Sequence, residues 1–430
     1  MPLKLNSKDN DFAKAFNRLI NDSRDIAFDV GDIVRDIIDD VKKNGNEALF
    51  RLSAKFDRVD LSEKTLRFND AEIEEAYRRT PKHVIEALEF AYARITSHHE
   101  KQLPISHIYQ DDIGVTLGSR WGAVHSAGLY VPGGLASYPS SVLMNAVPAK
   151  VAGVKRLVMA VPTPNGEVNP AVLAAAKIAN IDEIYKVGGA QAIGALAFGT
   201  ESITPVNKIV GPGNAFVAEA KRQVFGIVGI DMIAGPSEIL IIADRSANPA
   251  WVAADLLAQA EHGSSAQAIL ITIDENLAEQ VEQEVERQLK LLSRADIAQE
   301  GWEKFGTIIT ASNLDEAFDL SNRLAPEHLE LALDEADKYL DLVANAGAIF
   351  LGHHTPEAIG DYVGGSNHVL PTAGSACFAS GLGVIDFMKR TSILGCDANS
   401  LAQLAKPTII LAKTEGLSAH ARSVSIRTNS

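Results

Sequence analysis

Glu327 and His328 are neighbours in the segment Ala325-Pro326-Glu327-His328, where a proline fixes the backbone at the junction of a loop and a regular element. Neighbouring side chains on a strand or at a helix start point in different directions, so this carboxyl and this imidazole can serve two separate proton transfers. An imidazole titrates near working pH and is suited to general acid–base chemistry. A Glu-His dipeptide is also common on protein surfaces, so both interpretations stay open from this segment alone.

Gln259 and His262 form a second candidate, in WVAADLLAQAEHG. They are three positions apart on a predicted helix that Gly263 terminates, so their side chains leave the same face. Such a pair can chelate a metal, although glutamine is seldom chosen as a zinc ligand. Taken in isolation, the pair is better explained as a polar helix end.

Two C-terminal segments add further polar groups. IFLGHHTPEAIGDYVGGSNHVLPT (349–372) holds Asp361 and His368 in a Gly-rich connection directly after a predicted strand. Loops at the carboxyl ends of strands are where α/β enzymes place their chemistry. The tail segment EGLSAH contains Glu415 and His420, and His420 read alone is a helix histidine.

Three glycine-rich turns, GLYVPGG (128–134), VGGAQAIG (187–194) and GPGNAF (211–216), lie at predicted strand–helix junctions. At such a junction backbone N–H groups and a helix N-terminus can receive a phosphate. None of the three is GxGxxG, because Phe216 occupies the place of the third glycine in the last of them. One such turn alone indicates only a tight turn, but three in one α/β module favour a dinucleotide bound without the usual fingerprint.

The two cysteines, Cys377 and Cys396, exclude certain chemistries. Two cysteines cannot build a thiolate-rich zinc site or a disulfide framework, and we expect a reducing, cytoplasmic location. Neither has a base as neighbour in the sequence, which argues against a thiohemiacetal route from an alcohol to an acid. An aldehyde intermediate would then be hydrated by water that a base such as Glu327 activates.

The elements that must position these groups follow an α/β pattern. Two helices are predicted, one from about residue 31 to a stop at Asn44-Gly45 and one over 82–95. From about residue 120 two series of short apolar strands alternate with helices, and the last of these helices is expected over 334–347. The sequence therefore predicts two Rossmann-like modules with parallel-rich sheets, plus small N-terminal and C-terminal helical segments. We assign residues 1–25 to a helical arm, 26–129 and 236–373 to the first module, 130–235 to the second, and 374–430 to a tail.

Overall composition sets limits on partners. The 430 residues include 40 Lys and Arg against 55 Asp and Glu, a net charge of −15. This balance argues against a nucleic-acid surface or an anionic membrane as partner. The first residues lack an apolar run of the kind that a secretory signal requires, and no stretch approaches the length of a membrane span.

Eight segments in order resemble the histidinol dehydrogenase family over residues 30–428. They are GLYVPGG, VGGAQAIGALAFGT, KIVGPGNAFV, DMIAGPSEILIIAD, DLLAQAEH, APEHLEL, GDYVGGSNHVLPT and EGLSAHARSVSIR. A co-linear set of this kind is far more specific than any single motif above. The missing GxGxxG is shared with the family.

The resemblance implies a set of site residues. The zinc ligands, with one ion per subunit, would be Gln259, His262, Asp361 and His420. The substrate would be bound by these four together with Ser237, His328 and Glu415, and NAD by Tyr130, Gln191 and Asn214. To these we add His368 as a partner of a ligand or carboxylate, although an ordinary loop histidine explains it equally well.

The resemblance also implies a reaction. L-histidinol would be oxidised to L-histidine in a four-electron reaction through bound L-histidinal, using two NAD per turnover. His328 would take the hydroxyl proton and Glu327 would activate the hydrating water. The tail of one subunit would complete the site of its partner in a homodimer.

Competing interpretations remain at this point. A related zinc- and NAD-dependent dehydrogenase could act on another amino or sulfonated alcohol, although the intact EGLSAH favours histidinol. A zinc hydrolase would turn over without nicotinamide and leave the glycine-rich turns unused. A zinc-stabilised structural protein would favour a closed thiolate site, which this chain cannot supply.

Overall fold

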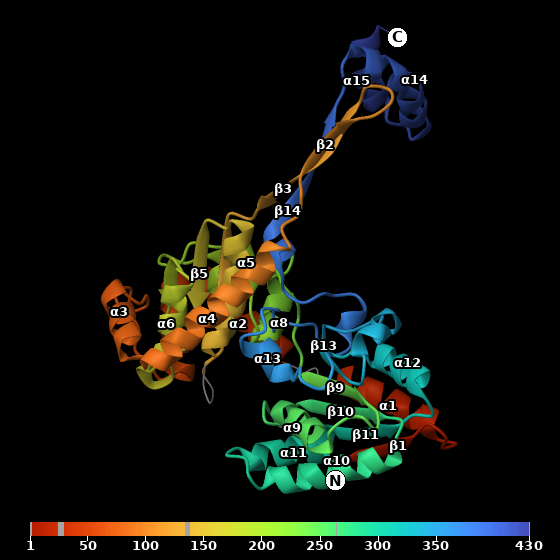
Figure 1. Ribbon diagram of the computed structural model, residues 1–430. Helices are drawn as coiled ribbons and strands as arrows, with labels where there is room; N and C mark the ends of the chain where they lie inside the picture. The colour runs from red at the N-terminus through yellow and green to blue at the C-terminus, as the bar shows by residue number, and fades with distance from the viewer. Residues whose placement is uncertain (1, 25–29, 134–137, 264, 430) are drawn as a thin grey trace.

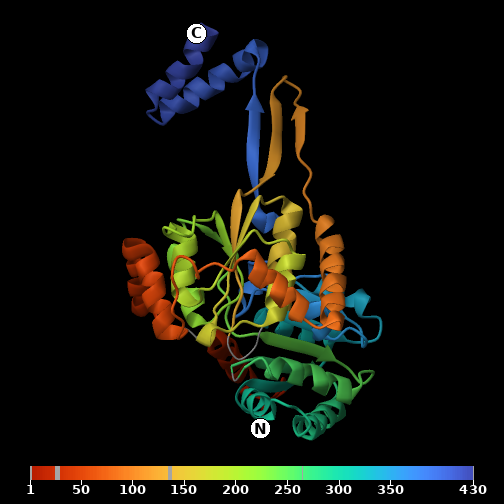
Figure 2. The same ribbon diagram turned by 90° about the vertical axis from the view of Figure 1, so that its left-hand side faces the viewer.

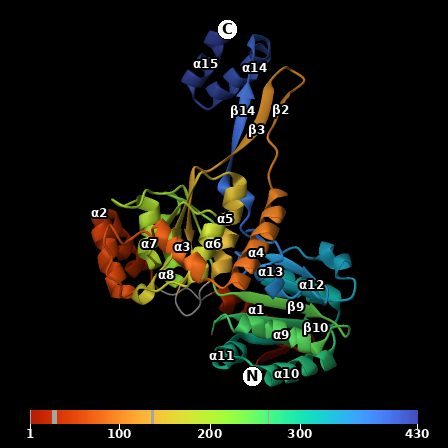
Figure 3. The same cartoon turned by 60° about the vertical axis from the view of Figure 1, so that its left-hand side comes forward.

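The protein, described here by a computed structural model, contains two parallel β-sheets and a long antiparallel ribbon (Figure 1). The structure describes residues 2–24, 30–133, 138–263 and 265–429. The two sheets with their helices form the body of the molecule, and the ribbon projects from it in all three views (Figures 1–3). The predicted α/β class with two parallel-rich sheets is confirmed.

The five-stranded sheet has the order β6-β5-β4-β7-β8, and every neighbouring pair is parallel. Its strands are β4 (Ser126–Tyr130), β5 (Arg156–Ala160), β6 (Glu183–Tyr185), β7 (Lys208–Val210) and β8 (Gly229–Ile230). The helices that connect them are α5 (Pro139–Ala152), α6 (Pro170–Ile178), α7 (Gly189–Phe198) and α8 (Ala215–Val224).

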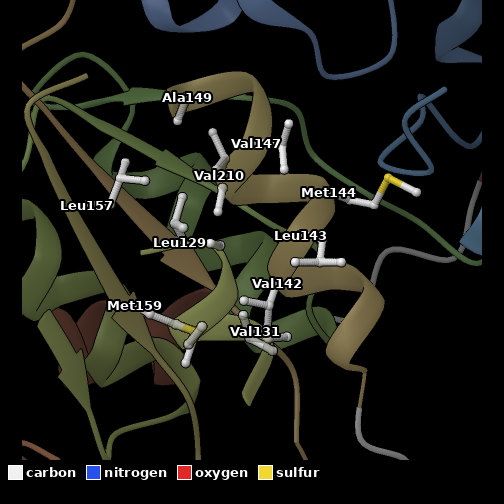
Figure 4. Close-up of a cluster of buried hydrophobic side chains, with 14 of the residues drawn as sticks. Leu129, Val131, Val142, Leu143, Met144, Val147, Ala149, Leu157, Met159 and Val210 are labelled. Carbon is white, nitrogen blue, oxygen red and sulfur yellow. The ribbon is translucent and has the colours of Figure 1, made fainter. Parts of the chain in front are cut away.

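Helix α5 lies at the centre of one face of this sheet, and Figure 4 shows its side chains against the strands. Val142, Leu143 and Met144 are fully buried, as are Leu129 and Leu157 on β4 and β5. A helix that is apolar all round is stable only when it is covered on every side. Each such side chain contributes about 1.5–3 kcal/mol to stability when it is buried. This packing holds the start of α5 firmly against the five-stranded sheet.

The N-terminal helices α2 (Gly31–Phe56), α3 (Asp70–Arg79) and α4 (Lys82–Glu100) pack on this five-stranded unit. Helix α2 contacts α7 and α8, α3 contacts α6, and α4 contacts α5. The sequence analysis assigned residues 26–129 to the same module as residues 236–373. This assignment is corrected, because the apolar faces of these helices are covered by helices of the five-stranded unit. Gly45, expected to end a helix, instead produces a kink within α2 (φ 50°, ψ −127°).

The six-stranded sheet has the order β1-β11-β10-β9-β12-β13 and is also parallel throughout. Its strands are β1 (Leu3–Asn6), β9 (Glu238–Ala243), β10 (Gln267–Thr272), β11 (Gly306–Thr310), β12 (His328–Ala332) and β13 (Ala348–Leu351). Its helices are α1 (Phe12–Arg24), α9 (Pro249–Ala260), α10 (Glu275–Leu289), α11 (Ala295–Phe305), α12 (Leu314–Leu324) and α13 (Glu357–Tyr362).

Three local predictions differ from this arrangement. The N-terminal arm is not only helical, since β1 pairs with β11 as an edge strand before α1 begins. The helix expected near 334–347 is a 3-10 helix, η2 (Ala336–Leu342). Asp361 was expected in a loop and lies instead on the short helix α13.

The projecting ribbon consists of β2 (His107–Gln110), β3 (Thr116–Ala123) and β14 (Met388–Gly395), with β3 in the centre. Two helices follow β14, α14 (Ala398–Thr414) and α15 (Ser418–Thr428), and they lie at the far end of the ribbon (Figure 1). We call β2, β3, β14, α14 and α15 the arm. The tail was expected to be helical, but β14 pairs with a strand some 270 positions earlier in the chain, from Met388 opposite Ala123 to Gly395 opposite Thr116.

Within the described residues, no helix combines the length and the apolar character that crossing a membrane requires.

Candidate active site

Several of the polar groups singled out in the sequence gather at the amino edge of the six-stranded sheet. Ser237 directly precedes β9 and Glu327 directly precedes β12, which itself begins at His328. In a parallel sheet each connecting helix returns to the edge where strands begin. Helix α9 therefore ends at this edge with Gln259 in its last turn, and α13 contributes Asp361.

Glu327 and His328 are both fixed to the backbone of one residue, Glu238. The N–H of Glu238 donates to Glu327 Oε2 at 2.8 Å, and the carbonyl of Glu238 lies 2.8 Å from His328 Nδ1. A carbonyl only accepts, so Nδ1 carries the hydrogen and the lone pair of the ring is on Nε2. His328 Nε2 has no hydrogen-bond partner among the described residues, and it lies 3.9 Å from Asp361 Oδ1.

Burial shifts the pKa values of this pair in opposite directions. It lowers the pKa of His328 to about 4, against a weaker opposing effect of the Asp361 carboxylate. It raises the pKa of Glu327 well above the usual carboxyl range, and the nearby Glu238 and Asp361 carboxylates add to that rise. The histidine is therefore neutral and able to accept a proton at neutral pH, while the carboxyl is a stronger base than an exposed glutamate.

A second buried carboxyl, Glu357, was not identified from the sequence. Its Oε1 lies 3.4 Å from His328 Nδ1, and burial raises its pKa well above the usual range, with the Asp361 carboxylate adding to the effect. One ligand atom each of His328, Glu357 and Asp361 lie within 4.8 Å of one another. Nothing local in Thr355-Pro356-Glu357 signals this position, because only the fold brings α13 against β12.

Glu330 is a further buried carboxyl that the sequence analysis missed, two positions along β12 from His328. Alternation in a strand places both side chains on one face. Burial raises the pKa of Glu330 to about 9, and the neighbouring Asp255 carboxylate adds to this. A signal did exist here, because HLELA puts two ionisable residues on the same face of an otherwise apolar strand.

The side chain of Gln259 is fully buried, and within the described residues neither its amide oxygen nor its amide nitrogen has a hydrogen-bond partner. A buried amide without partners costs about 1–3 kcal/mol, so its atoms are suited to a group that binds here. Helix α9 ends at Ala260, two residues earlier than expected, and His262 lies in the following turn, where its N–H donates to the Gln259 carbonyl at 3.1 Å. The amide, the imidazole of His262 and the Asp361 carboxylate are donor types that a divalent cation with mixed N and O ligands accepts.

A cavity of about 320 Å³ opens beside His262. Tyr138, Ser140 and Leu143 at the start of α5 line one wall, and Tyr362 of α13 lines another. The start of α5 also contacts His368, whose Nε2 lies 3.1 Å from Ser141 Oγ while its Nδ1 lies 3.0 Å from the Asp361 carbonyl. His368 thus links α5 to the helix that carries Asp361. Its role as a partner of a metal ligand stays a prediction.

Tyr130, Gln191 and Asn214 lie at the carboxyl edge of the five-stranded sheet. Tyr130 ends β4, and its buried hydroxyl oxygen accepts from the Gly189 N–H at 3.0 Å. Gln191 is buried in the first turn of α7, while the exposed Asn214 caps α8 by accepting from the N–H groups of Phe216 and Val217. The start of a helix, with its free N–H groups, is an anion-binding position.

Glu415 and His420 are not brought to these groups within one chain. Glu415 ends α14 and His420 lies in α15, and both side chains are exposed on the arm. In Figures 1–3 the two helices lie at the far end of the ribbon, away from both parallel sheets.

The fold and the site together define a two-sheet α/β protein with a buried acid–base pair next to potential metal ligands. A family model described as histidinol dehydrogenase matches residues 21–428, and the chain belongs to this family. The chain is 61% identical to histidinol dehydrogenase of Agrobacterium fabrum over 97% of both chains, and 58% identical to that of Rhizobium meliloti over 100% of this chain and 99% of the relative. The crystal structure of histidinol dehydrogenase from Elizabethkingia anophelis is similar with a TM-score of 0.94 and 37% identity, over 100% of this chain and 98% of that one.

Proposed function

We propose that this protein oxidises L-histidinol to L-histidine through enzyme-held L-histidinal, with one zinc ion per subunit and two NAD per turnover. The observation that carries the proposal is the Glu327–His328 pair, fixed to Glu238, with His328 Nε2 3.9 Å from Asp361 Oδ1. The unpartnered amide of Gln259 lies at the same sheet edge. Membership of the histidinol dehydrogenase family supports the substrate and NAD. The family resemblance and the mixed donor set of Gln259, His262 and Asp361 support zinc.

His328 is the proposed base for the alcohol. Its Nδ1–H is held by the Glu238 carbonyl, so its Nε2 accepts the hydroxyl proton as the substrate carbon loses a hydride. NAD, when bound, accepts that hydride. The product of this first two-electron step is the aldehyde, which the enclosed site protects from loss to solvent.

Glu327 is the proposed base for the second step. It removes a proton from a water molecule as the oxygen of that water bonds to the aldehyde carbon, which gives the hydrate. Loss of a second hydride and of the remaining protons yields the carboxylate, so one histidinol and one water give one histidine and two NADH. A zinc ion, when bound, would hold the amino and imidazole nitrogens of the substrate and so keep the aldehyde in place.

The remaining predicted ligand, His420, and the predicted imidazole partner, Glu415, would come from the arm of a second subunit. The projection of the arm supports this proposal, since it carries both residues away from the body of their own chain (Figure 2). Large apolar side chains are also exposed along the arm, as interfaces require: Ile108, Leu394, Ile410 and Leu411. We propose a homodimer with exchanged arms. A cytoplasmic location is proposed as well, supported by two free, exposed cysteines.

The reaction is tested by the NADH formed per L-histidinol consumed, with zinc-loaded protein and a chelated control. We expect about two NADH per substrate and loss of turnover after chelation. A protein with zinc bound that forms no NADH from histidinol would instead favour dehydrogenation of another amino or sulfonated alcohol.

The shared site is tested by mixing two inactive variants, His262→Asn and His420→Asn. If each site takes His262 from one chain and His420 from the other, random exchange restores up to about a quarter of wild-type activity, because half of the dimers have one intact site. The control is each variant incubated alone. Failure to recover activity after proven subunit exchange would show that the arm does not complete the partner's site.

A further inference from the structure

An ion pair buried behind the third glycine-rich turn holds both backbone polar groups of Gly211. Lys221 Nζ donates to the Gly211 carbonyl at 3.0 Å, and the Gly211 N–H donates to Asp231 Oδ2 at 2.8 Å. Lys221 also forms a short ion pair with Asp231 Oδ1. Lys221 comes from α8 and Asp231 directly follows β8, so the two elements after β7 hold the residue with which the turn starts.

The Lys221–Asp231 ion pair is almost completely buried, and such burial does not by itself stabilise a protein. The side chains of Lys221 and Asp231 are 2% and 1% exposed. Removing two charges from water costs several kcal/mol per ion, and well-packed apolar residues are often as stable or more stable in their place. Hydrogen bonds to the backbone of Gly211, which apolar side chains could not make, offset part of this cost. The effect that only this ion pair can produce is therefore to fix the position of Gly211.

The position of Gly211 matters because the turn is packed against Tyr130. Gly211 has φ 119°, and a Cβ on it would lie 2.1 Å from the Tyr130 carbonyl oxygen. The turn reaches Asn214 only three residues later, where α8 begins. A shift at Gly211 is consequently transmitted over two intervening residues to Asn214 and to the N–H groups at the start of α8.

We propose that Lys221 and Asp231 are positioning residues for NAD, which hold the turn 211–214 so that Asn214 and the start of α8 face the dinucleotide. The inference rests on the proposed function, with NAD placed at this edge by the predicted cofactor residues Tyr130, Gln191 and Asn214. Neither residue touches the cofactor, since both are buried behind the turn. Their role is to fix the backbone that does.

The test is the double variant Lys221→Met/Asp231→Asn, which removes both charges and keeps similar size. We expect the KM for NAD and the Kd for NADH, measured by fluorescence titration, to rise about tenfold. The kcat and the KM for histidinol should stay within about twofold, because the Glu327–His328 pair lies at the other sheet.

The matched control is Arg156→Met/Glu183→Gln, in the same sheet. Arg156 Nε and Glu183 Oε1 form a 2.6 Å ion pair at the first residues of β5 and β6, the amino edge, opposite to the NAD side. Both double variants should lower the Tm. Only the Lys221/Asp231 variant should raise the KM for NAD, a split that a purely structural role would not produce.

An unchanged NADH Kd in the folded double variant would overturn the proposal. Should that variant fail to fold, Asp231→Asn alone keeps the shape and an acceptor for the Gly211 N–H, and we expect about a threefold weaker NADH affinity; no change there would also overturn it. Asn214→Ala, which removes both the cap and the amide, separates the two hypotheses: if it leaves the KM for NAD unchanged, NAD is not bound at this edge, and it is the placement of NAD in the proposed function that is wrong.

Discussion

The two parallel sheets contribute opposite edges to the chemistry proposed here. The five-stranded sheet offers its carboxyl edge, where the helices α7 and α8 begin and where Gln191 and Asn214 lie. The six-stranded sheet offers its amino edge, where β9 and β12 begin and α9 ends with Gln259. Helix N-termini attract anions and helix C-termini attract cations. One sheet thus suits a pyrophosphate and the other a metal ion with bases.

This difference explains why the two sheets carry different kinds of residue. Anion binding at helix N-termini uses backbone N–H groups, so glycine-rich turns with few charged side chains are sufficient. Proton transfer and metal binding need ionisable side chains, and the amino edge of the six-stranded sheet holds Glu327, His328, Glu357 and Asp361 together. Variants at the two edges should therefore affect different kinetic constants.

The largest expected effect is at the amino edge of the six-stranded sheet. His328→Asn removes the base whose Nε2 has no partner within the described residues, and kcat should fall about 10³-fold with the NADH Kd little changed. Steady-state kinetics and NADH titration measure the two quantities.

The control for this prediction is His353→Asn. His353 follows β13 at the carboxyl edge of the same sheet, where its Nε2 lies 3.2 Å from Asp334 Oδ1. This variant should keep wild-type kcat. If it lost as much activity as His328→Asn, the division of labour between the two edges would be wrong.

An intermediate effect is expected at the carboxyl edge of the five-stranded sheet. Asn214→Ala should raise the KM for NAD about tenfold and lower stability by about 1 kcal/mol, because Asn214 also caps α8. Asn214→Ser restores a cap but not the amide, so it should recover the Tm and keep the raised KM. A serine variant that recovers both would show that only the cap matters.

The smallest effect concerns the pH dependence of stability near β12. Burial and Asp255 raise the pKa of Glu330 to about 9, so the folded protein holds this proton more tightly than the unfolded chain. The resulting stability is fully present below the ordinary glutamate pKa and is lost as pH rises toward 9. Glu330→Gln should therefore remove roughly 2–4 °C of the decline in Tm between pH 6 and 9.

Glu183→Gln is the control of opposite sign in the other sheet. Burial acts to raise the pKa of Glu183, but hydrogen bonds from Arg156 and Tyr185 outweigh it and the pKa is lowered. The stability from Glu183 is present above the ordinary glutamate pKa and is lost as pH falls. Glu183→Gln should therefore reduce only the fall in Tm at acid pH. If the Tm of Glu330→Gln fell between pH 6 and 9 as much as that of the wild type, this would contradict the raised pKa of Glu330.

Much of the fold follows from local signals in the sequence. The alternation of apolar strands with helices predicted both parallel sheets, and Asn169, Asn214 and Asn248 cap helices where the pattern changes. The end of the chain was predicted to be helical, and the last described element is the helix α15, Ser418–Thr428. The family itself was identified from the order of eight segments and is confirmed by the family model.

Other features required the tertiary structure. The helices of residues 31–100 show an apolar face but not which sheet covers it, and β14 has no partner until β3 is brought beside it. Glu357 is an ordinary carboxyl until α13 packs against His328, and the Nδ1–H tautomer of His328 depends on the Glu238 carbonyl of the neighbouring strand.

The sequence by itself thus determined the types of element, the turns and the residue types available for acid–base and ligand chemistry, because capping, periodicity and glycine conformations act over a few neighbouring residues. Only the tertiary structure decided which groups meet, which edge of each sheet they occupy and which carboxyls are buried. The reason is that burial and pKa shifts depend on residues that are distant in the chain. Glu415 and His420 are a further example, because the sequence shows their types but only the fold shows that they lie on the arm.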